Sequence, residues 1–257
     1  MSGELNITYL VCATPRSGSA LLCDGLWNTK IAGQPDEYFN PDYLDKIGIP
    51  NGDLSAHCRK IFELGLGSNG VSGVKAMWWA LEEFVNRVQK NNKQYKDVTV
   101  WRLKKYFPPL KYVWITRINK RRQAISFSRM IQTGVSRKLK EDLSGNDRIP
   151  VFDFQQIDNL AKELTRADAH WRQFFKKHNI EPLKIVYEDF IHRYDETLLT
   201  VLKFLGVPIP EKFVIPECRL VRQSDAQSED WLRKYSDIKQ HQKKNPALLL
   251  SRFLQRQ

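Results

Sequence analysis

Residues 14–20 form a short basic loop whose composition suits the binding of an anion. The loop reads Thr-Pro-Arg-Ser-Gly-Ser-Ala and stands between an apolar run, residues 7–13, and a stretch with helical spacing of leucines. A helix that begins directly after such a loop directs unpaired backbone N–H groups and the positive end of its dipole at it. Arg16 adds a guanidinium that can bind phosphate or sulfate oxygens. The loop therefore predicts a phosphate or sulfate site, with a capped turn that binds no ligand as the alternative.

The loop differs from the phosphate-binding loop of common nucleotide hydrolases. That motif would place a lysine at Ser19 and a serine or threonine at Ala20 if Gly18 is its second glycine. Without the lysine that contacts the terminal phosphates, and without the hydroxyl that binds Mg²⁺, phosphoryl transfer of the usual kind is disfavoured. A nucleotide kinase whose lysine lies elsewhere in the chain remains an alternative.

A second candidate phosphate contact comes from Arg117 and Ser126. Arg117 ends the apolar run 111–117, and Ser126 lies in the helical pattern that follows it. An arginine that leaves a parallel strand lies at the carboxyl edge of the sheet, where open α/β sheets bind ligands. We expect the two side chains to contact the same phosphate. The remaining basic residues of the pattern are expected to form a solvated face: Arg121, Arg122 and Arg129.

Four apolar, β-rich runs position these residues and alternate with helical patterns. They cover residues 7–13, 70–78, 111–117 and 183–190. The first is continuously apolar, which indicates a strand buried on both faces, as in a parallel sheet covered by helices. The alternation predicts an α/β doubly wound domain with few antiparallel strand pairs.

Capping residues and apolar spacing mark the longer helices. Asn119 is expected as the N-cap of a helix that ends at Gly134, its C-cap. Apolar side chains at helical spacing predict further helices over 153–178 and 195–205.

The remaining segments lack strand patterns. Residues 136–150 are polar and rich in turn formers, so we expect a mobile insertion there. Residues 228–257 form a C-terminal helical segment, which we expect to be broken at Pro246. We expect residues 1–257 to form a single domain.

The composition is that of a globular but strongly basic chain. Its 257 residues include 41 lysines and arginines against 29 aspartates and glutamates, a net charge of +12. An anionic partner is expected, and nucleic acid, a membrane surface or a phosphorylated cofactor would each qualify. The non-enzymatic alternative is a nucleic-acid-binding domain with residues 119–140 as its surface. Aromatic residues do not alternate with the basic ones there in a stacking pattern.

Membrane, disulfide and metal classes receive no support from the sequence. No stretch approaches the roughly 20 apolar residues of a membrane span. The N-terminal residues contain no basic leader, so we expect a cytoplasmic protein. The four cysteines include no CxxC pair and no histidine at zinc-finger spacing, so we expect reduced thiols and no metal site.

Five segments in order resemble the PAPS-dependent bacterial sulfotransferases typified by trehalose 2-sulfotransferase. They are PRSGS at 15–19, GQPDEYF at 33–39, GVKAMW at 73–78, TR…QAISFSR at 116–129 and RQSDAQSEDW at 222–231. The match spans nearly the whole chain, and five segments in the same order are far more specific than any one of them.

The resemblance implies a P-loop-like three-layer sandwich with a mainly parallel central sheet and helices on both faces. It implies that the sulfuryl group of 3′-phosphoadenosine 5′-phosphosulfate (PAPS) passes to an acceptor hydroxyl, or to a nitrogen, and leaves 3′-phosphoadenosine 5′-phosphate (PAP), with no metal. The residues that match the family's nucleotide contacts are Arg16, Ser17, Gly18, Ser19 and Ala20 for the 5′-phosphosulfate, Arg117 and Ser126 for the 3′-phosphate, and Tyr187, Arg222 and Gln223 for the rest of the nucleotide.

By the same resemblance Glu37 is the general base, while Arg16 and Lys75 stabilise charge on the leaving phosphate oxygen. Ala20 stands where the family commonly has threonine, and an acidic residue is often found in place of Gln34, so trehalose itself is a doubtful acceptor. We expect a small metabolite or carbohydrate, and the oligomeric state stays open, a homodimer included. The acceptor contacts expected are Gln34, Glu37, Trp78 and Trp171, with core packing as the alternative for both tryptophans.

Overall fold

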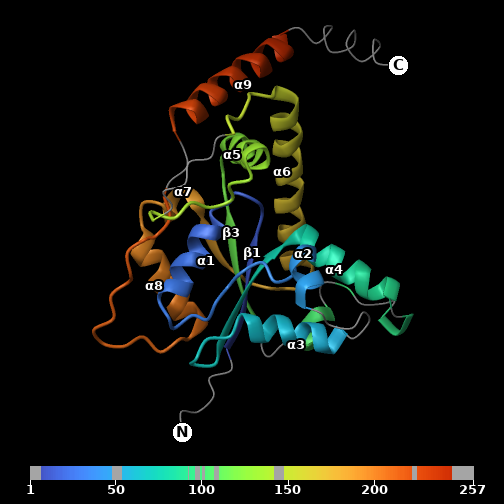
Figure 1. Ribbon diagram of the computed structural model, residues 1–257, viewed down its shortest axis with the longest axis vertical. Helices are drawn as coiled ribbons and strands as arrows, with labels where there is room; N and C mark the ends of the chain where they lie inside the picture. Colours follow the sequence, from blue (N-terminus) through green and yellow to red (C-terminus); the bar gives the residue numbers. More distant parts are fainter. Residues whose placement is uncertain are drawn as a thin grey trace. The chain divides into compact units, whose positions relative to one another are not determined.

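The chain forms two compact units in the computed structural model shown in Figure 1. The first unit comprises residues 1–118 and 163–220, and the second comprises residues 119–162 and 221–257. The single domain expected from the sequence remains a prediction. The structure describes residues 7–47, 54–91, 93–95, 99, 102–106, 110–141, 148–221 and 225–244.

A parallel sheet forms the centre of the first unit. Its strands are β1 (Ile7–Ala13), β2 (Val71–Met77), β3 (Leu110–Thr116) and β4 (Leu183–Val186). They lie in the order β2-β1-β3-β4, and each described pairing is parallel. β1 is therefore paired on both edges, and six of its seven residues are buried, as its apolar sequence predicted.

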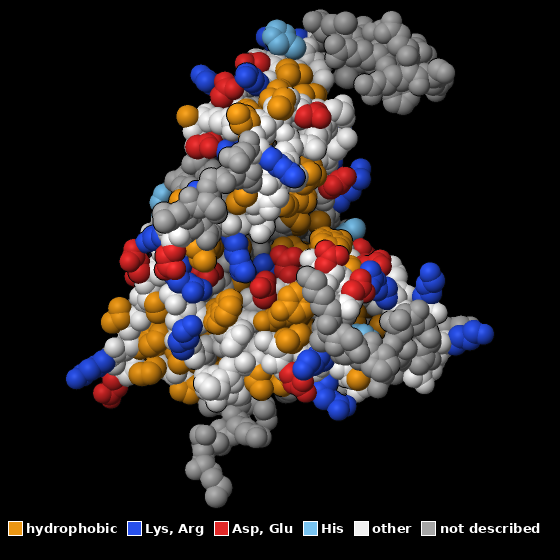
Figure 2. Space-filling view, in the orientation of Figure 1, with side chains coloured by type: hydrophobic (Ala, Val, Ile, Leu, Met, Phe, Trp, Pro, Cys, Tyr) orange, Lys and Arg blue, Asp and Glu red, His pale blue; other side chains and the backbone are white. Residues whose placement is uncertain are grey.

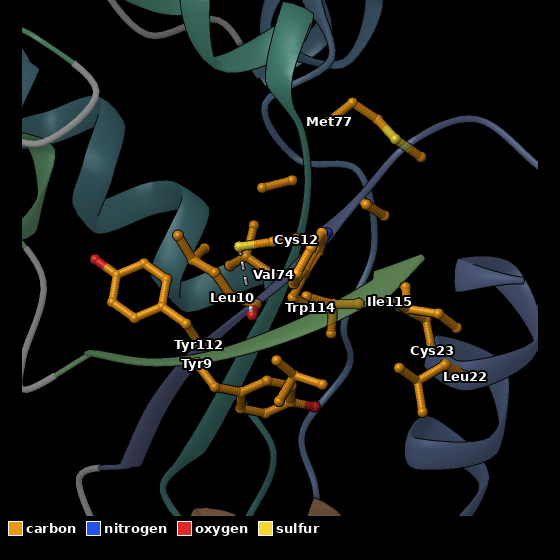
Figure 3. Close-up of a cluster of buried hydrophobic side chains, with 14 of the residues drawn as sticks. Tyr9, Leu10, Cys12, Leu22, Cys23, Val74, Met77, Tyr112, Trp114 and Ile115 are labelled. Carbon is orange, nitrogen blue, oxygen red and sulfur yellow. Dashed lines mark hydrogen bonds between the residues drawn. The ribbon is translucent and has the colours of Figure 1, made fainter. Parts of the chain in front are cut away.

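Helices cover both faces of this sheet, which confirms the predicted α/β layers. Figure 1 shows α1 (Ser19–Asn28) and α8 (Tyr194–Leu205) on one side and α3 (Leu54–Leu64) and α4 (Trp78–Asn91) on the other. The buried side chains of β1, β2, β3 and α1 belong to one hydrophobic cluster, part of which is shown in Figure 3.

Successive residues of β3 alternate between the two faces, as the pleat of a strand requires. Tyr112 and Trp114 lie on one face and contact Phe175 of α6 (Phe154–Lys177), with ring centroids 6.1 and 5.7 Å away. Val113 and Ile115 are also fully buried. Both faces of β3 are thus covered.

The connections differ from the predicted pattern in two places. The run 183–190 is a strand only as far as Val186, because Tyr187–Phe190 form a single helical turn, α7. Glu188 and Asp189 lie in the first turn, where a helix dipole favours acidic side chains. Neither α2 (Pro41–Ile47) nor α3 was predicted from the sequence. Two short 3₁₀ turns, η1 (Lys93–Tyr95) and η2 (Arg102–Tyr106), lie between α4 and β3.

The second unit contains α5 (Lys120–Thr133), the beginning of α6, and α9 (Ala226–Lys244). Both predicted caps of α5 are confirmed. The Asn119 side chain accepts a hydrogen bond from the Arg122 amide at 3.0 Å, and Gly134 has the left-handed φ of 75° typical of a C-cap.

The basic face predicted on α5 is partly neutralised by acidic residues at the start of α9. Arg122 pairs with Glu229, and Arg129 forms a two-pronged pair with Asp225 at 2.6 and 2.7 Å. Arg121 is exposed. The basic residues of α5 therefore serve partly to attach α9 within this unit.

The segments on either side of α6 are described in part. Of the predicted insertion 136–150, residues 142–147 lie outside the described residues, as does Pro246. Gln132 holds the end of this segment, since its side chain accepts a hydrogen bond from the Val151 amide at 2.7 Å and donates one to the Val151 carbonyl at 3.0 Å. Among the helices described here, none has the length and apolar character to cross a membrane.

Asp158 is a buried carboxylate that connects α6 to α9. The Tyr235 hydroxyl donates to it at 2.7 Å, and it forms ion pairs with Lys239 at 2.6 Å and with Lys162 at 2.9 Å. Burial alone would raise the pKa of Asp158, but these three donors lower it to about 2.

We predict that Asp158→Asn lowers the free energy of unfolding by about 2 kcal/mol at pH 7. The folded pKa lies below the ordinary value of 3.8, so this stabilisation is complete above about pH 4 and disappears as the pH falls through about 2. Urea unfolding at pH 7 and at pH 3 measures the difference. The matched control is Asp230→Asn on α9, whose exposed pairs should contribute little at either pH; an equal loss in both variants would contradict the prediction.

Candidate functional site

The site lies at the carboxyl ends of the strands of the first unit. β1 pairs with β2 on one side and with β3 on the other, so the connections that leave β1 and β2 run in opposite directions across the sheet. Such a switch point, at the carboxyl ends of the strands, is where open α/β sheets bind ligands. The loop 14–18 follows β1, Arg117 follows β3 and Tyr187 follows β4, as the sequence predicted for the first two.

The loop after β1 presents hydrogen-bond donors that the fold itself does not use. Arg16 and Gly18 both have positive φ angles, 60° and 94°, and turn the chain sharply into α1. The first helical bond runs from the Leu22 amide to the Gly18 carbonyl, so the three preceding amides have no acceptor within the helix. The buried hydroxyl of Ser17 has no hydrogen-bond partner among the described residues. These donors suit an anion.

The charge around this loop is positive. No acidic residue lies in the first turn of α1, all of whose residues are described. The Arg117 guanidinium lies beside the loop, with a long hydrogen bond of 3.4 Å to the Arg16 carbonyl. The same guanidinium lies over the Tyr187 ring, 4.5 Å from its centroid. The structure therefore brings together Arg16, Arg117 and Tyr187, three of the predicted nucleotide contacts.

α6 fixes the ends of β1 and β3. The Thr116 hydroxyl donates to the buried Asp168 carboxylate at 2.5 Å, and the Trp171 indole donates to the Ala13 carbonyl at 3.0 Å. Sequence reasoning missed Asp168, although a carboxylate on the buried stripe of α6 was a signal for it. Trp171 has no exposed surface. Trp171 is therefore a core residue, which was the alternative considered for it from the sequence. Its contact with the acceptor stays a prediction.

Glu37 and Lys75 form an ion pair that connects the segment after α1 to β2. The Lys75 ammonium lies 2.9 Å from Glu37 Oε1 and 3.6 Å from Asp36 Oδ1. The Lys75 amide also donates to the Asp36 carbonyl at 2.9 Å, which attaches the segment to the strand edge. Lys75 is 7% exposed, whereas the Glu37 side chain is 33% exposed. Glu37 is therefore both held and accessible.

Electrostatics keep this lysine charged despite its burial. Burial alone would lower the pKa of Lys75, but the carboxylates of Glu37 and Asp36 raise it above its ordinary value. Burial raises the pKa of the Cys23 thiol to about 12, against the opposite effect of Lys75. Cys23 is therefore a neutral thiol at physiological pH and not a nucleophile. No cluster of metal-binding side chains occurs in the described part of the chain.

The other predicted contacts fall into three groups. Ser126 lies on α5 of the second unit, while Arg222 and Gln223 lie outside the described residues. Gln34 is exposed, and its amide donates to the Gly65 carbonyl at 2.8 Å. Trp78 is half-buried and packs edge-on against Trp171, with centroids 5.1 Å apart. Their roles as ligand contacts stay predictions.

Basic and acidic side chains are intermixed on the face shown in Figure 2. Among the described side chains on this face, Lys and Arg do not gather into one uninterrupted patch, and Asp and Glu lie between them. A surface of this kind differs from the continuous basic stripe typical of nucleic-acid-binding domains.

Comparisons with known proteins identify relatives of this chain. The family model described as Stf0 sulphotransferase matches residues 8–237. The trehalose 2-sulfotransferases of Mycolicibacterium smegmatis and Mycobacterium tuberculosis are 27% and 26% identical to it, and each comparison covers 88% of this chain and 93% of the relative. Among solved structures, the sulfotransferase domain from the curacin biosynthetic pathway has a TM-score of 0.48 at 16% identity, covering 88% of this chain and 83% of that one.

Gly18 is a position where a side chain cannot fit. We predict that Gly18→Ala destabilises the protein more than Gly134→Ala does. Both glycines are left-handed, so both substitutions cost about 1–2 kcal/mol in backbone strain. Only at Gly18 would the added β-carbon meet another group, 2.4 Å from Cδ2 of Tyr187; at Gly134 nothing lies within 4 Å. Denaturant unfolding of the two variants checks this, and equal losses would show that Tyr187 does not pack on the loop.

Proposed function

We propose, because this chain belongs to the Stf0 sulphotransferase family, that it transfers the sulfuryl group of PAPS to a hydroxyl of a carbohydrate or another small metabolite. The family match makes the chain a sulfotransferase, an enzyme of the EC 2.8.2 type. The donor, the acceptor class and the role of each residue are the proposal. The observation that carries the choice of donor is the loop after β1, with its unused amides, its buried hydroxyl and Arg16, and with Arg117 beside it.

The donors in this loop fit the sulfate and phosphate oxygens of PAPS. The Arg16 side chain, the Ser17 hydroxyl, Gly18 and the first amides of α1, those of Ser19 and Ala20, would hold the 5′-phosphosulfate. Arg117 would hold the 3′-phosphate, and Ser126 remains a predicted phosphate contact. When bound, PAPS supplies a sulfuryl group attached to a phosphate that leaves readily. For the rest of the nucleotide we propose Arg222 and Gln223.

Glu37 is proposed as the general base. A hydroxyl is a poor nucleophile, and a carboxylate within hydrogen-bond reach takes its proton as the new oxygen–sulfur bond forms and the bond from sulfur to the phosphate oxygen breaks. Lys75 fixes the direction of the Glu37 carboxylate through their 2.9 Å contact. Arg16 balances the negative charge that develops on the leaving phosphate oxygen. The ion pair between Lys75 and Glu37 supports a role for Lys75 in holding the general base. It gives less direct support to the predicted contact of Lys75 with the leaving phosphate oxygen.

The acceptor is proposed from the relatives and from the surroundings of Glu37. The mycobacterial and mycolicibacterial relatives are both named trehalose 2-sulfotransferase, which favours a carbohydrate. Gln34 and Trp78 are the acceptor contacts we propose. Because Gln34 is neutral and cannot act as a charged acceptor for sugar hydroxyls, we propose a sugar other than trehalose. A homodimer and a cytoplasmic location remain predictions.

The family match does not favour the two alternatives considered from the sequence. A nucleotide kinase would need a lysine and a Mg²⁺-binding hydroxyl that Ser19 and Ala20 do not supply. In the nucleic-acid alternative the basic residues of α5 would face a phosphate backbone, whereas Arg122 and Arg129 are paired with acidic residues of α9.

Replacing Arg117 tests the nucleotide assignment. We predict that Arg117→Ala weakens the binding of PAP by at least about tenfold, since a charged contact to phosphate contributes roughly 1.5–3 kcal/mol. Isothermal titration calorimetry measures the affinity. The control is Arg193→Ala, which removes an exposed arginine of the same unit that pairs with Glu196. Wild-type affinity in Arg117→Ala would refute the assignment of the 3′-phosphate.

Replacing Glu37 tests its proposed role as the general base. We expect Glu37→Gln to lower kcat by about 10²–10⁴-fold, because the amide cannot accept the proton, while PAP affinity stays unchanged. Transfer from radiolabelled PAPS to an acceptor, found by screening carbohydrates first, measures the rate. The control is Glu63→Gln, an exposed glutamate on α3. A Glu37→Gln variant that transfers sulfate at the wild-type rate would mean that another group is the base.

A further inference from the structure

The Tyr187 ring lies against two parts of the site at once. A β-carbon built on Gly18 would lie 2.4 Å from Cδ2 of Tyr187, so the ring packs directly on the backbone of the loop. The guanidinium carbon of Arg117 lies 4.5 Å from the centroid of the same ring, within the range of a cation–π contact. The ring therefore connects the loop after β1 to the arginine after β3.

The next residue, Glu188, fixes the backbone beside Arg117. Its Oε2 accepts a hydrogen bond from the Ile118 amide at 3.0 Å. The parallel pairing of β3 and β4 sets Val186 opposite Thr116, so α7 begins where Arg117 leaves the sheet. A single helical turn thus contacts the side chain of Arg117 through Tyr187 and the backbone after it through Glu188.

We infer that Tyr187 is a positioning residue for Arg117, whose guanidinium its ring holds beside the loop, and that this is the function of the ring in place of stacking on the adenine. The inference rests on the proposed function, in which Arg117 binds the 3′-phosphate. An arginine held by a flat ring before the ligand arrives loses less conformational freedom when it binds. The benefit therefore concerns only ligands that carry a 3′-phosphate.

Two ligands and two variants distinguish the positioning of Arg117 by Tyr187 from a direct contact of Tyr187 with the adenine. PAP and AMP share the adenine, the ribose and the 5′-phosphate, and only PAP has the 3′-phosphate. Calorimetry should show that Tyr187→Leu weakens PAP binding by about five- to tenfold and leaves AMP binding unchanged. Tyr187→Phe retains the ring and should bind both ligands as wild type does.

Equal weakening of PAP and AMP in Tyr187→Leu would mean that the ring stacks on the adenine, and it would overturn the inference. Unchanged binding of both ligands would overturn it as well. Failure of the wild type to distinguish PAP from AMP would instead reject the proposed 3′-phosphate contact of Arg117, which is a failure of the proposed function.

A measurement without ligand keeps the inference testable in that case, and also if Tyr187→Leu does not fold. The Nε–Hε signal of Arg117, assigned by its loss in Arg117→Lys, should be shifted upfield by the ring current in the wild type and in Tyr187→Phe. In folded Tyr187→Leu the shift should disappear. An unshifted signal in the wild type and in Tyr187→Phe overturns the inference, whatever the calorimetry shows.

Discussion

The turn that follows β1 is the constraint on which the rest of the site depends. β1 is paired on both edges and covered on both faces, so its end cannot move without disturbing the whole sheet. The chain must reverse into α1 within the five residues 14–18, which it does through the left-handed Arg16 and Gly18. That turn directs the first amides of α1 away from the sheet. The same steric requirement that ends the strand therefore presents the donors proposed to bind the anion.

The position of the segment that carries Asp36 and Glu37 depends on a second requirement, the compensation of a buried charge. Lys75 lies on the central part of β2, where an unpaired ammonium would be strongly destabilising. Asp36 and Glu37 satisfy it from the segment after α1, and the backbone contact of Asp36 with the strand keeps them in place. A carboxylate near the sheet edge is thereby held in one direction while a third of its side chain stays exposed. The ion pair compensates the buried charge and at the same time holds Glu37, the proposed general base.

Several elements were predictable because their signals are local. A run of seven residues with six apolar side chains predicts β1, Asn119 and Gly134 predict the limits of α5, and the loop after β1 is recognised from its own composition. Tyr187–Phe190 was misjudged because four residues of mixed character fit a strand end and a helical turn equally well. Asp168 was missed for another reason, since its partner Thr116 lies 52 positions away along the chain.

By itself, the sequence determined the α/β layers, the anion loop and the candidate base, because hydrophobic period, capping residues and loop composition act over a few neighbouring residues. Only the tertiary structure decided which of those residues meet. Lys75 reaches Glu37, and Arg117 reaches Tyr187 and Arg16, because parallel pairing brings the ends of strands distant in sequence to one edge of the sheet. Contacts of this kind depend on strand order and register, which are set by the packing of the whole unit rather than by any segment of it.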